Sequence, residues 1–204
     1  MSFSRVFSFS LGSHVTKYLL ISALFTFSLI SNAGTLWPDL DINNPELSKN
    51  TVMLQCQKSL MYAPRQLEKW CEKAYDMGEY EALLFIGHHT GDGSRYVNEL
   101  KRRVLKNENL AIRRLAWLYD GGLFVEEDLK EAARLYELFL TQAEEPYPIL
   151  LRSIHYDLAK IYTKLEDWPN VIINAQYVID QKLDDGSDTL AKTLKENAVA
   201  AMNN

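Results

Sequence analysis

The sequence predicts an all-α fold. After about residue 50, apolar residues recur at three- and four-residue spacing in every segment, and no segment alternates apolar and polar residues as a half-buried strand would. Glycines and prolines interrupt this pattern at intervals of one short helix. These observations together indicate short helices joined by tight turns.

The first residues, 1–33, have the pattern of a secretory signal peptide. Arg5 and Lys17 are its only charges, and the apolar run from Tyr18 to Ile30 is shorter than the about 20 residues that cross a bilayer. The small residues of Ser31-Asn32-Ala33 suit a signal peptidase. We expect cleavage there, a periplasmic or secreted chain, and no stable membrane insertion afterwards. An uncleaved N-terminal anchor is the alternative.

The composition of the mature chain limits its partners. Removing 33 of the 204 residues leaves 171, enough for one domain with a buried core. The net charge of the whole chain is −5, and loss of the two basic residues in the signal peptide changes it to −7. Such a mildly acidic body offers no basic surface to nucleic acid or to an anionic membrane, so we expect neither as a partner.

An N-terminal lead and a helical domain follow. Residues 34–50 contain prolines and asparagines without a sustained period, which indicates an extended lead, and residues 51–204 form the helical repeat domain. Periodicity predicts helices over residues 51–62, 64–77, 79–90, 94–106, 108–120, 126–143, 148–165, 168–182 and 187–202. The predicted joints are Gly78, Gly91-Asp92-Gly93, Gly121-Gly122, Pro146 to Pro148 and Asp184-Asp185-Gly186.

Two cysteines, Cys56 and Cys71, lie in the first predicted helical hairpin. An even number of cysteines in an exported chain favours a disulfide. The midpoint between them falls at Ala63-Pro64, the predicted break between two helices, and residues equally far from the turn of an antiparallel pair lie opposite each other. We therefore expect a bridge. Metal binding by the two cysteines is the weaker alternative, because no histidine stands nearby at ligand spacing.

The pair Gly121-Gly122 is interpreted as the hinge of a helical hairpin. A phosphate loop is excluded because acids follow the glycines where a lysine is needed. A calcium loop needs oxygen ligands at alternate positions, and Asp120 is followed by two glycines, leucine and phenylalanine. We expect a left-handed cap at the glycines, Val125 packed into the hairpin, and the acids Glu126 to Asp128 at the start of the next helix.

One pattern of a large apolar residue, a small residue and a residue one turn later recurs along the chain. The copies are Ala82-x-x-x-Ile86-Gly87-x-x-Thr90-x-x-Gly93, Ala111-x-x-x-Leu115-Ala116-x-x-Tyr119-x-x-Gly122 and Leu158-Ala159-x-x-Tyr162. The first two superpose with an offset of 29 residues. The small residue allows two helices to approach closely, which is how stacked hairpins pack.

On these residues the chain resembles helical repeat proteins. Ala111 to Tyr136 resembles the short repeat of the SEL-one-like family, with matches at Leu115-Ala116, Leu118-Tyr119, Gly122, Val125, Asp128, Ala132 and Leu135-Tyr136. Leu158 to Ile179 resembles the standard tetratricopeptide repeat. Departures are Glu166 for glycine, Glu131 for lysine, and Leu138 and Phe139 for small residues. The resemblance implies a right-handed superhelix of stacked helical hairpins that ends in a capping helix.

The resemblance also implies the mode of action: a protein- or peptide-binding adaptor or scaffold of the cell envelope, without catalysis or cofactor. In the repeat register the side chains that face the groove are His88, Arg113, Trp117, Tyr156, Lys160 and Lys164. These are basic and aromatic, so we expect an envelope protein or peptide segment of acidic character as the partner. A core position for Trp117 is the alternative. Other implied roles are a periplasmic component of a flagellar motor and a chaperone or regulator of an envelope enzyme.

The most enzyme-like segment is Gly87-His88-His89-Thr90-Gly91-Asp92-Gly93. Adjacent histidines on a helix point about 100° apart, so they do not share one metal easily. Serine nucleophile motifs and dinucleotide fingerprints are absent from the sequence. We expect no enzyme and no metal, and a hydrolase centred on His88 and His89 is the alternative.

Overall fold

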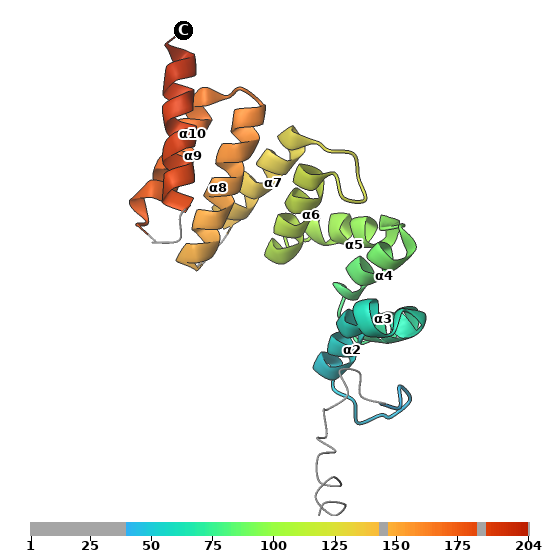
Figure 1. The fold of residues 1–204 in the computed structure, drawn as a ribbon. Helices are drawn as coiled ribbons and strands as arrows, with labels where there is room; N and C mark the ends of the chain where they lie inside the picture. Colours follow the sequence, from blue (N-terminus) through green and yellow to red (C-terminus); the bar gives the residue numbers. More distant parts are fainter. Residues whose placement is uncertain (1–39, 143–146, 183–186, 204) are drawn as a thin grey trace, which may run out of the picture. The chain divides into compact units, whose positions relative to one another are not determined.

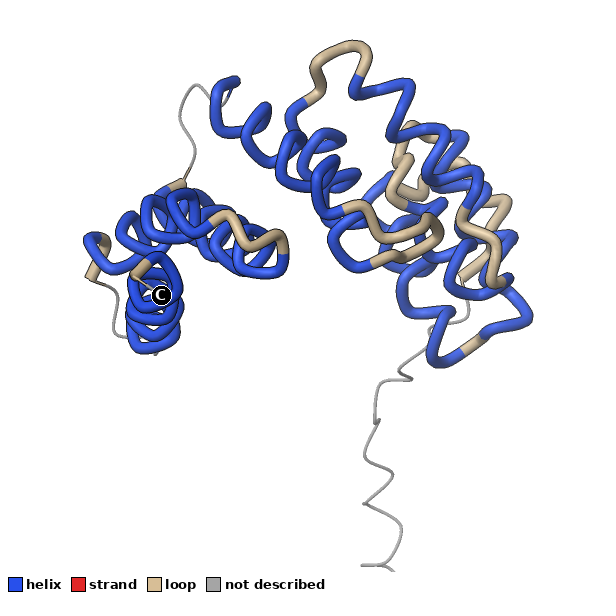
Figure 2. The backbone as a smooth tube through the Cα atoms, turned by 90° about the horizontal axis from the view of Figure 1, so that it is seen from above, coloured by secondary structure: helices blue, strands red, loops and turns tan. Residues whose placement is uncertain are grey.

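The computed structural model describes residues 40–142, 147–182 and 187–203, which all belong to the unit that begins at Leu40. The elements are α2 (Lys49–Tyr62), a short 3-10 helix η1 (Pro64–Gln66), α3 (Leu67–Asp76), α4 (Ala82–Thr90), α5 (Ser94–Val104), α6 (Asn109–Gly121), α7 (Leu129–Gln142), α8 (Pro148–Lys164), α9 (Trp168–Asp180) and α10 (Ser187–Met202) (Figure 1). Figure 2 shows only helices and loops in these residues. The all-α prediction is confirmed for this part of the chain. The predicted signal peptide 1–33 and residues 34–39 of the lead lie outside it.

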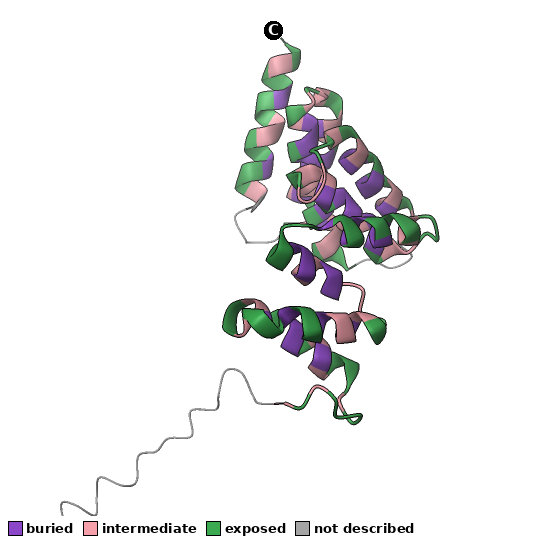
Figure 3. Ribbon diagram, turned by 90° about the vertical axis from the view of Figure 1, so that its right-hand side faces the viewer, coloured by how far each residue is buried: buried purple, intermediate pink, exposed green. Residues whose placement is uncertain are grey.

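Each helix packs against its neighbours in the chain. Contacts join every consecutive pair from α2 to α10, and further contacts join α2 to α4 and α8 to α10. Buried residues lie where these helices face one another, and the outer faces are exposed (Figure 3). The described residues thus form packed helical hairpins, an arrangement compatible with a helical repeat fold.

The small residues of the recurring pattern lie where helices meet. Ala116 and Ala159 are both 0% exposed, and Gly87 is also buried. Their apolar partners Ile86, Leu115, Leu158 and Tyr162 are buried as the register predicts, whereas Tyr119 is only half-buried. In the last three helices the small residues form a cluster of their own, made of Ala159, Ala175, Val178 and Ala191. Short side chains at these positions bring the helix backbones close together.

The disulfide between Cys56 and Cys71 is confirmed. The two Cα atoms are 4.6 Å apart, and both side chains are 0% exposed between α2 and α3. Helix α2 ends at Tyr62, and Pro64 opens η1, so the chain turns where the symmetric spacing places the turn. A bridge that closes a loop with a sequence separation of 15 stabilises the fold by about 3 kcal/mol in the chain-entropy model.

Helices α2, α3, α4, α6 and α7 begin at other residues than periodicity predicts. Helix α2 starts at Lys49, inside the predicted lead, because the Ser48 hydroxyl accepts a hydrogen bond from the Thr51 amide at 3.2 Å. Helix α7 starts after Asp128, whose carboxylate accepts a hydrogen bond from the Glu131 amide at 3.0 Å. Helix α4 starts at Ala82 rather than 79, after a turn that contains Gly78 with φ +95°. Capping, which periodicity does not register, sets the starts of α2 and α7, whereas α4 has no side-chain cap.

The Gly121-Gly122 pair ends α6 as predicted. Gly122 has φ +62°, and its amide donates to the Leu118 carbonyl, which is the left-handed cap expected of a helix C-terminus. Val125 is half-buried in the connection to α7. Among the residues that the structure describes, none of the helices combines the length and apolar character needed to cross a membrane.

Candidate partner-binding site

A cavity of about 230 Å³ lies beside the predicted binding residues of α6. Arg113 and Trp117 are four residues apart, so they lie on one side of α6, and both line this cavity. The other lining residues come from α6, α7 and α8: Arg114, Tyr136, Leu150, Ser153, Ile154 and Asp157. Trp117 is 41% exposed. Its indole ring therefore offers a flat apolar surface at the cavity instead of filling the core.

Helix α8 carries the other three predicted residues of the α6 to α8 region. The ammonium group of Lys160 lies 5.0 Å from the ring centroid of Tyr156 and 2.7 Å from the carboxylate of Asp157. The ammonium group of Lys164 lies 2.9 Å from the carboxylate of Glu127, in the loop before α7. Exposed pairs of this kind contribute at most about 1 kcal/mol each. Both lysines nevertheless have acidic partners within the chain.

These acids reduce the local excess of positive charge that the sequence predicts. Asp157 stands three residues before Lys160, and Asp120 three residues after Trp117, spacings that place each acid on the face of its basic or aromatic neighbour. Neither acid is among the binding residues predicted from the sequence, although the three-residue spacing alone indicates that each lies beside a predicted binding residue. Arg113 has no ion-pair partner among the described residues, so it is the cation of the cavity that remains available to a ligand.

The electrostatics of this region follow from burial and from the carboxylates. Burial, and then the negative charge of Asp157, raise the pKa of Asp120 against the opposing effect of Lys164 and Lys160. Burial lowers the pKa of Lys160, but the hydrogen bond and charge of Asp157 outweigh it, and the net shift is upward. Burial also raises the pKa of Tyr136. At neutral pH the Tyr136 hydroxyl keeps its proton and can donate a hydrogen bond in the cavity. Lys160 is charged, but it is not among the residues that line the cavity.

His88 is not part of this cavity. Its ring lies on α4 with its centroid 5.3 Å from the ring centroid of Phe124, at an interplanar angle of 59°. The structure therefore gathers Arg113 and Trp117 in one cavity and places Lys160 and Tyr156 together on α8. It gives His88 a different neighbour, the ring of Phe124.

The glycines around His88 hold the Phe124 ring. A Cβ atom added to Gly93 would lie 2.0 Å from Cγ of Phe124, and one added to Gly87 would lie 2.9 Å from Cζ of the same ring. Phe124 itself has φ +62°, a conformation that is rare for a bulky residue. The segment from Gly87 to Gly93 thus packs closely against the loop after α6, and this contact is called the seat of Phe124. Close packing against the Phe124 ring therefore explains why Gly87 and Gly93 are glycines.

The three histidines that the structure describes, His88, His89 and His155, differ in their surroundings. Over residues 40–142, 147–182 and 187–203, no group of three or more His, Cys, Asp or Glu side chains could hold a metal ion. His88 and His89 have no hydrogen-bond partner among these residues, whereas an imidazole base is usually oriented by a third group. His155 is placed differently. Its Nδ1 lies 2.7 Å from the Asn174 side-chain oxygen, and its ring stacks on Tyr177 at 3.8 Å between centroids.

Comparison of the chain with protein-family models, with curated proteins and with solved structures finds no match in any of the three. The similarity to SEL-one-like and tetratricopeptide repeats therefore remains a resemblance of residues and spacing. The structure adds to this resemblance that the described helices form packed hairpins.

Proposed function

We propose that this chain is an exported adaptor that binds a segment of another envelope protein at the cavity between α6, α7 and α8. The observation that carries the proposal is the pairing of an unpaired guanidinium, Arg113, with a half-exposed indole, Trp117, at one cavity. Arginine and tryptophan are the residue types that most often dominate binding energy at protein interfaces. An acidic side chain beside an apolar one fits this pair.

Export is part of the proposal and rests on separate observations. A disulfide whose cysteines are fully buried forms and persists most readily in an oxidising compartment. The sequence of residues 1–33 has the charge and length pattern of a signal peptide. N-terminal sequencing of the protein from its native cell should give Gly34 as the first residue. A chain that retains Tyr18 to Ile30 in the membrane would contradict export as a soluble protein.

The binding site is tested by site-specific crosslinking followed by charge reversal. A photoreactive amino acid at Trp117 should crosslink the partner in the native envelope, and the same probe at Arg65, an exposed residue of η1, should not. With the captured partner purified, Arg113→Glu should weaken binding at least about tenfold, equivalent to about 1.4 kcal/mol.

The matched control for charge is Arg65→Glu, which makes the same change outside the cavity. Lys160→Glu is a poorer test, because it would place two acids beside each other where Lys160 now pairs with Asp157. Arg113→Glu should leave the helical circular dichroism unchanged. If this variant binds the partner as the wild type does, the cavity is not the binding site.

A further inference from the structure

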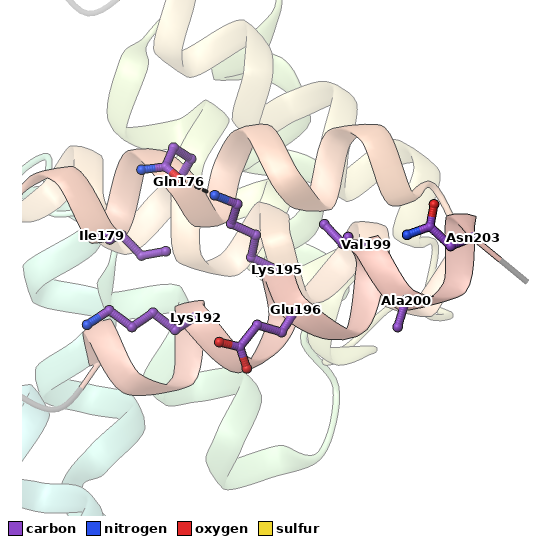
Figure 4. A pocket seen from close by; sticks show the side chains of 8 residues that line it. All are labelled: Gln176, Ile179, Lys192, Lys195, Glu196, Val199, Ala200 and Asn203. Carbon is purple, nitrogen blue, oxygen red and sulfur yellow. Dashed lines mark hydrogen bonds between the residues drawn. The ribbon is translucent and has the colours of Figure 1, made fainter.

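A second surface lies between α9 and α10, the last two helices of the chain that the structure describes. It is a groove of about 630 Å³ whose apolar lining includes Ile179 of α9 and Val199 and Ala200 of α10 (Figure 4). The ammonium group of Lys195 crosses from α10 to the side-chain oxygen of Gln176 on α9 at 2.6 Å, shown as a dashed line in Figure 4. This groove shares no lining residue with the cavity at Arg113.

Exposed apolar side chains extend the groove along both helices. Ile173 is 63% exposed and stands three residues before Gln176 on α9, and Met202 is 55% exposed and stands three residues after Val199 on α10. Residues three apart lie on the same side of a helix. Helix α10 packs on α9, as expected of a capping helix, but a cap presents a polar outer face. A contiguous apolar face of this kind marks an interaction surface.

The charges at the rim indicate which partner fits. Lys192 and Glu196 both line the groove, both are exposed, and neither has an ion-pair or hydrogen-bond partner among the described residues. They have opposite signs and stand four residues, about one turn, apart on α10. A uniformly acidic or basic partner would satisfy one of them and be repelled by the other.

A second copy of the chain satisfies both. Under a two-fold axis that crosses α10 between these residues, two α10 helices run antiparallel, and Lys192 of each copy faces Glu196 of its partner. The same arrangement covers Val199 and the apolar floor of both grooves. We infer that the face formed by α9 and α10 is a homodimer interface in which the helix α10 of one copy lies in the groove of the other.

The test is the oligomeric state of the mature protein, measured by sedimentation velocity over a series of concentrations. We expect a reversible dimer. Lys192→Glu and Glu196→Lys should each raise the dimer dissociation constant at least about tenfold, because symmetry places each altered contact in the interface twice. The double variant Lys192→Glu with Glu196→Lys restores opposite charges and should dimerise within about threefold of the wild type.

Two further variants complete the experiment. Val199→Asp should give a monomer, and Lys106→Glu, an exposed charge reversal on the segment after α5, should leave the dimer unchanged. All these positions are exposed, so circular dichroism should show intact helices. A wild type that is monomeric at every concentration would overturn the inference. The inference would also be overturned if the double variant failed to recover the dimer affinity that each single charge reversal loses.

Discussion

The seat of Phe124 allows a quantitative test of the fold, through the substitution Gly93→Ala. The new Cβ would lie 2.0 Å from Cγ, 2.1 Å from Cδ2 and 2.6 Å from Cβ of Phe124. The ring has little freedom to withdraw, because the loop that carries it is tied to α6 by hydrogen bonds from the amides of Leu123 and Asp128. Forcing one extra carbon into a packed site usually costs about 1–3 kcal/mol.

We expect Gly93→Ala to lie near the upper end of that range, at about 3 kcal/mol, and to lower the melting temperature by roughly 6–12 °C for a chain of this size. The matched control is Gly121→Ala. Gly121 has no atom within 4 Å of an added Cβ and lies at the end of α6, so alanine there should be neutral or slightly stabilising.

A double-mutant cycle separates the clash from other effects of alanine at position 93. Because the Cβ of Phe124 takes part in the clash, the partner substitution is Phe124→Gly, which also removes the strain of a positive φ. In that background Gly93→Ala should cost no more than the about 1 kcal/mol expected when alanine replaces a good residue at a helix N-cap. Urea unfolding followed by circular dichroism gives all four free energies. If Gly93→Ala costs the same in both backgrounds, Phe124 does not sit against Gly93, and the reasoning fails.

Two further predictions concern the α2–α3 hairpin and the α8–α9 hairpin. Replacing Cys56 and Cys71 together by alanine should lower the free energy of unfolding by about 3 kcal/mol, and an unchanged urea midpoint would show that the bridge does not constrain the chain. Burial lowers the pKa of His155 below its ordinary value of 6.5, against the effect of its hydrogen bond with Asn174. As the pH falls, the His155 imidazole therefore takes up its proton in the unfolded chain before it does so in the folded chain. The contribution of the neutral imidazole to the free energy of unfolding is complete above pH 6.5 and is lost as the pH falls below it. His155→Gln should flatten the dependence of the melting temperature on pH below about 6.5, and an unaltered slope would contradict this origin.

Much of the fold is predictable from the sequence because it depends on local signals. Periodicity identifies the helices, since most bury one face against a neighbour only one or two helices away. The turn at Pro64 and the symmetric cysteines around it predict the first hairpin and its bridge. The errors at the starts of α2 and α7 arise from single side chains, Ser48 and Asp128, which cap these helices by hydrogen bonds that periodicity does not contain.

The candidate site is less predictable because it depends on contacts between distant residues. The repeat register identifies Arg113 and Trp117, which the structure places at one cavity. The register does not show that Glu127 forms an ion pair with Lys164, because the loop before α7, which carries Glu127, has no repeat spacing. The seat of Phe124 is hidden for a further reason. It needs a left-handed backbone at a phenylalanine, which residue preferences disfavour.

The packing of each described helix against helices one or two positions away in the chain has a consequence for how the chain folds. Hydrogen bonds between described residues reach at most 37 positions along the sequence, from Glu127 to Lys164. Contacts of short sequence separation need little loop closure before they form, so chains built from them fold quickly. Units that open cooperatively often coincide with such motifs, so we expect the hairpins to differ in their rates of amide hydrogen exchange. The bridged hairpin of α2 and α3 remains crosslinked when the rest opens, and it supplies a template on which α4 can pack again.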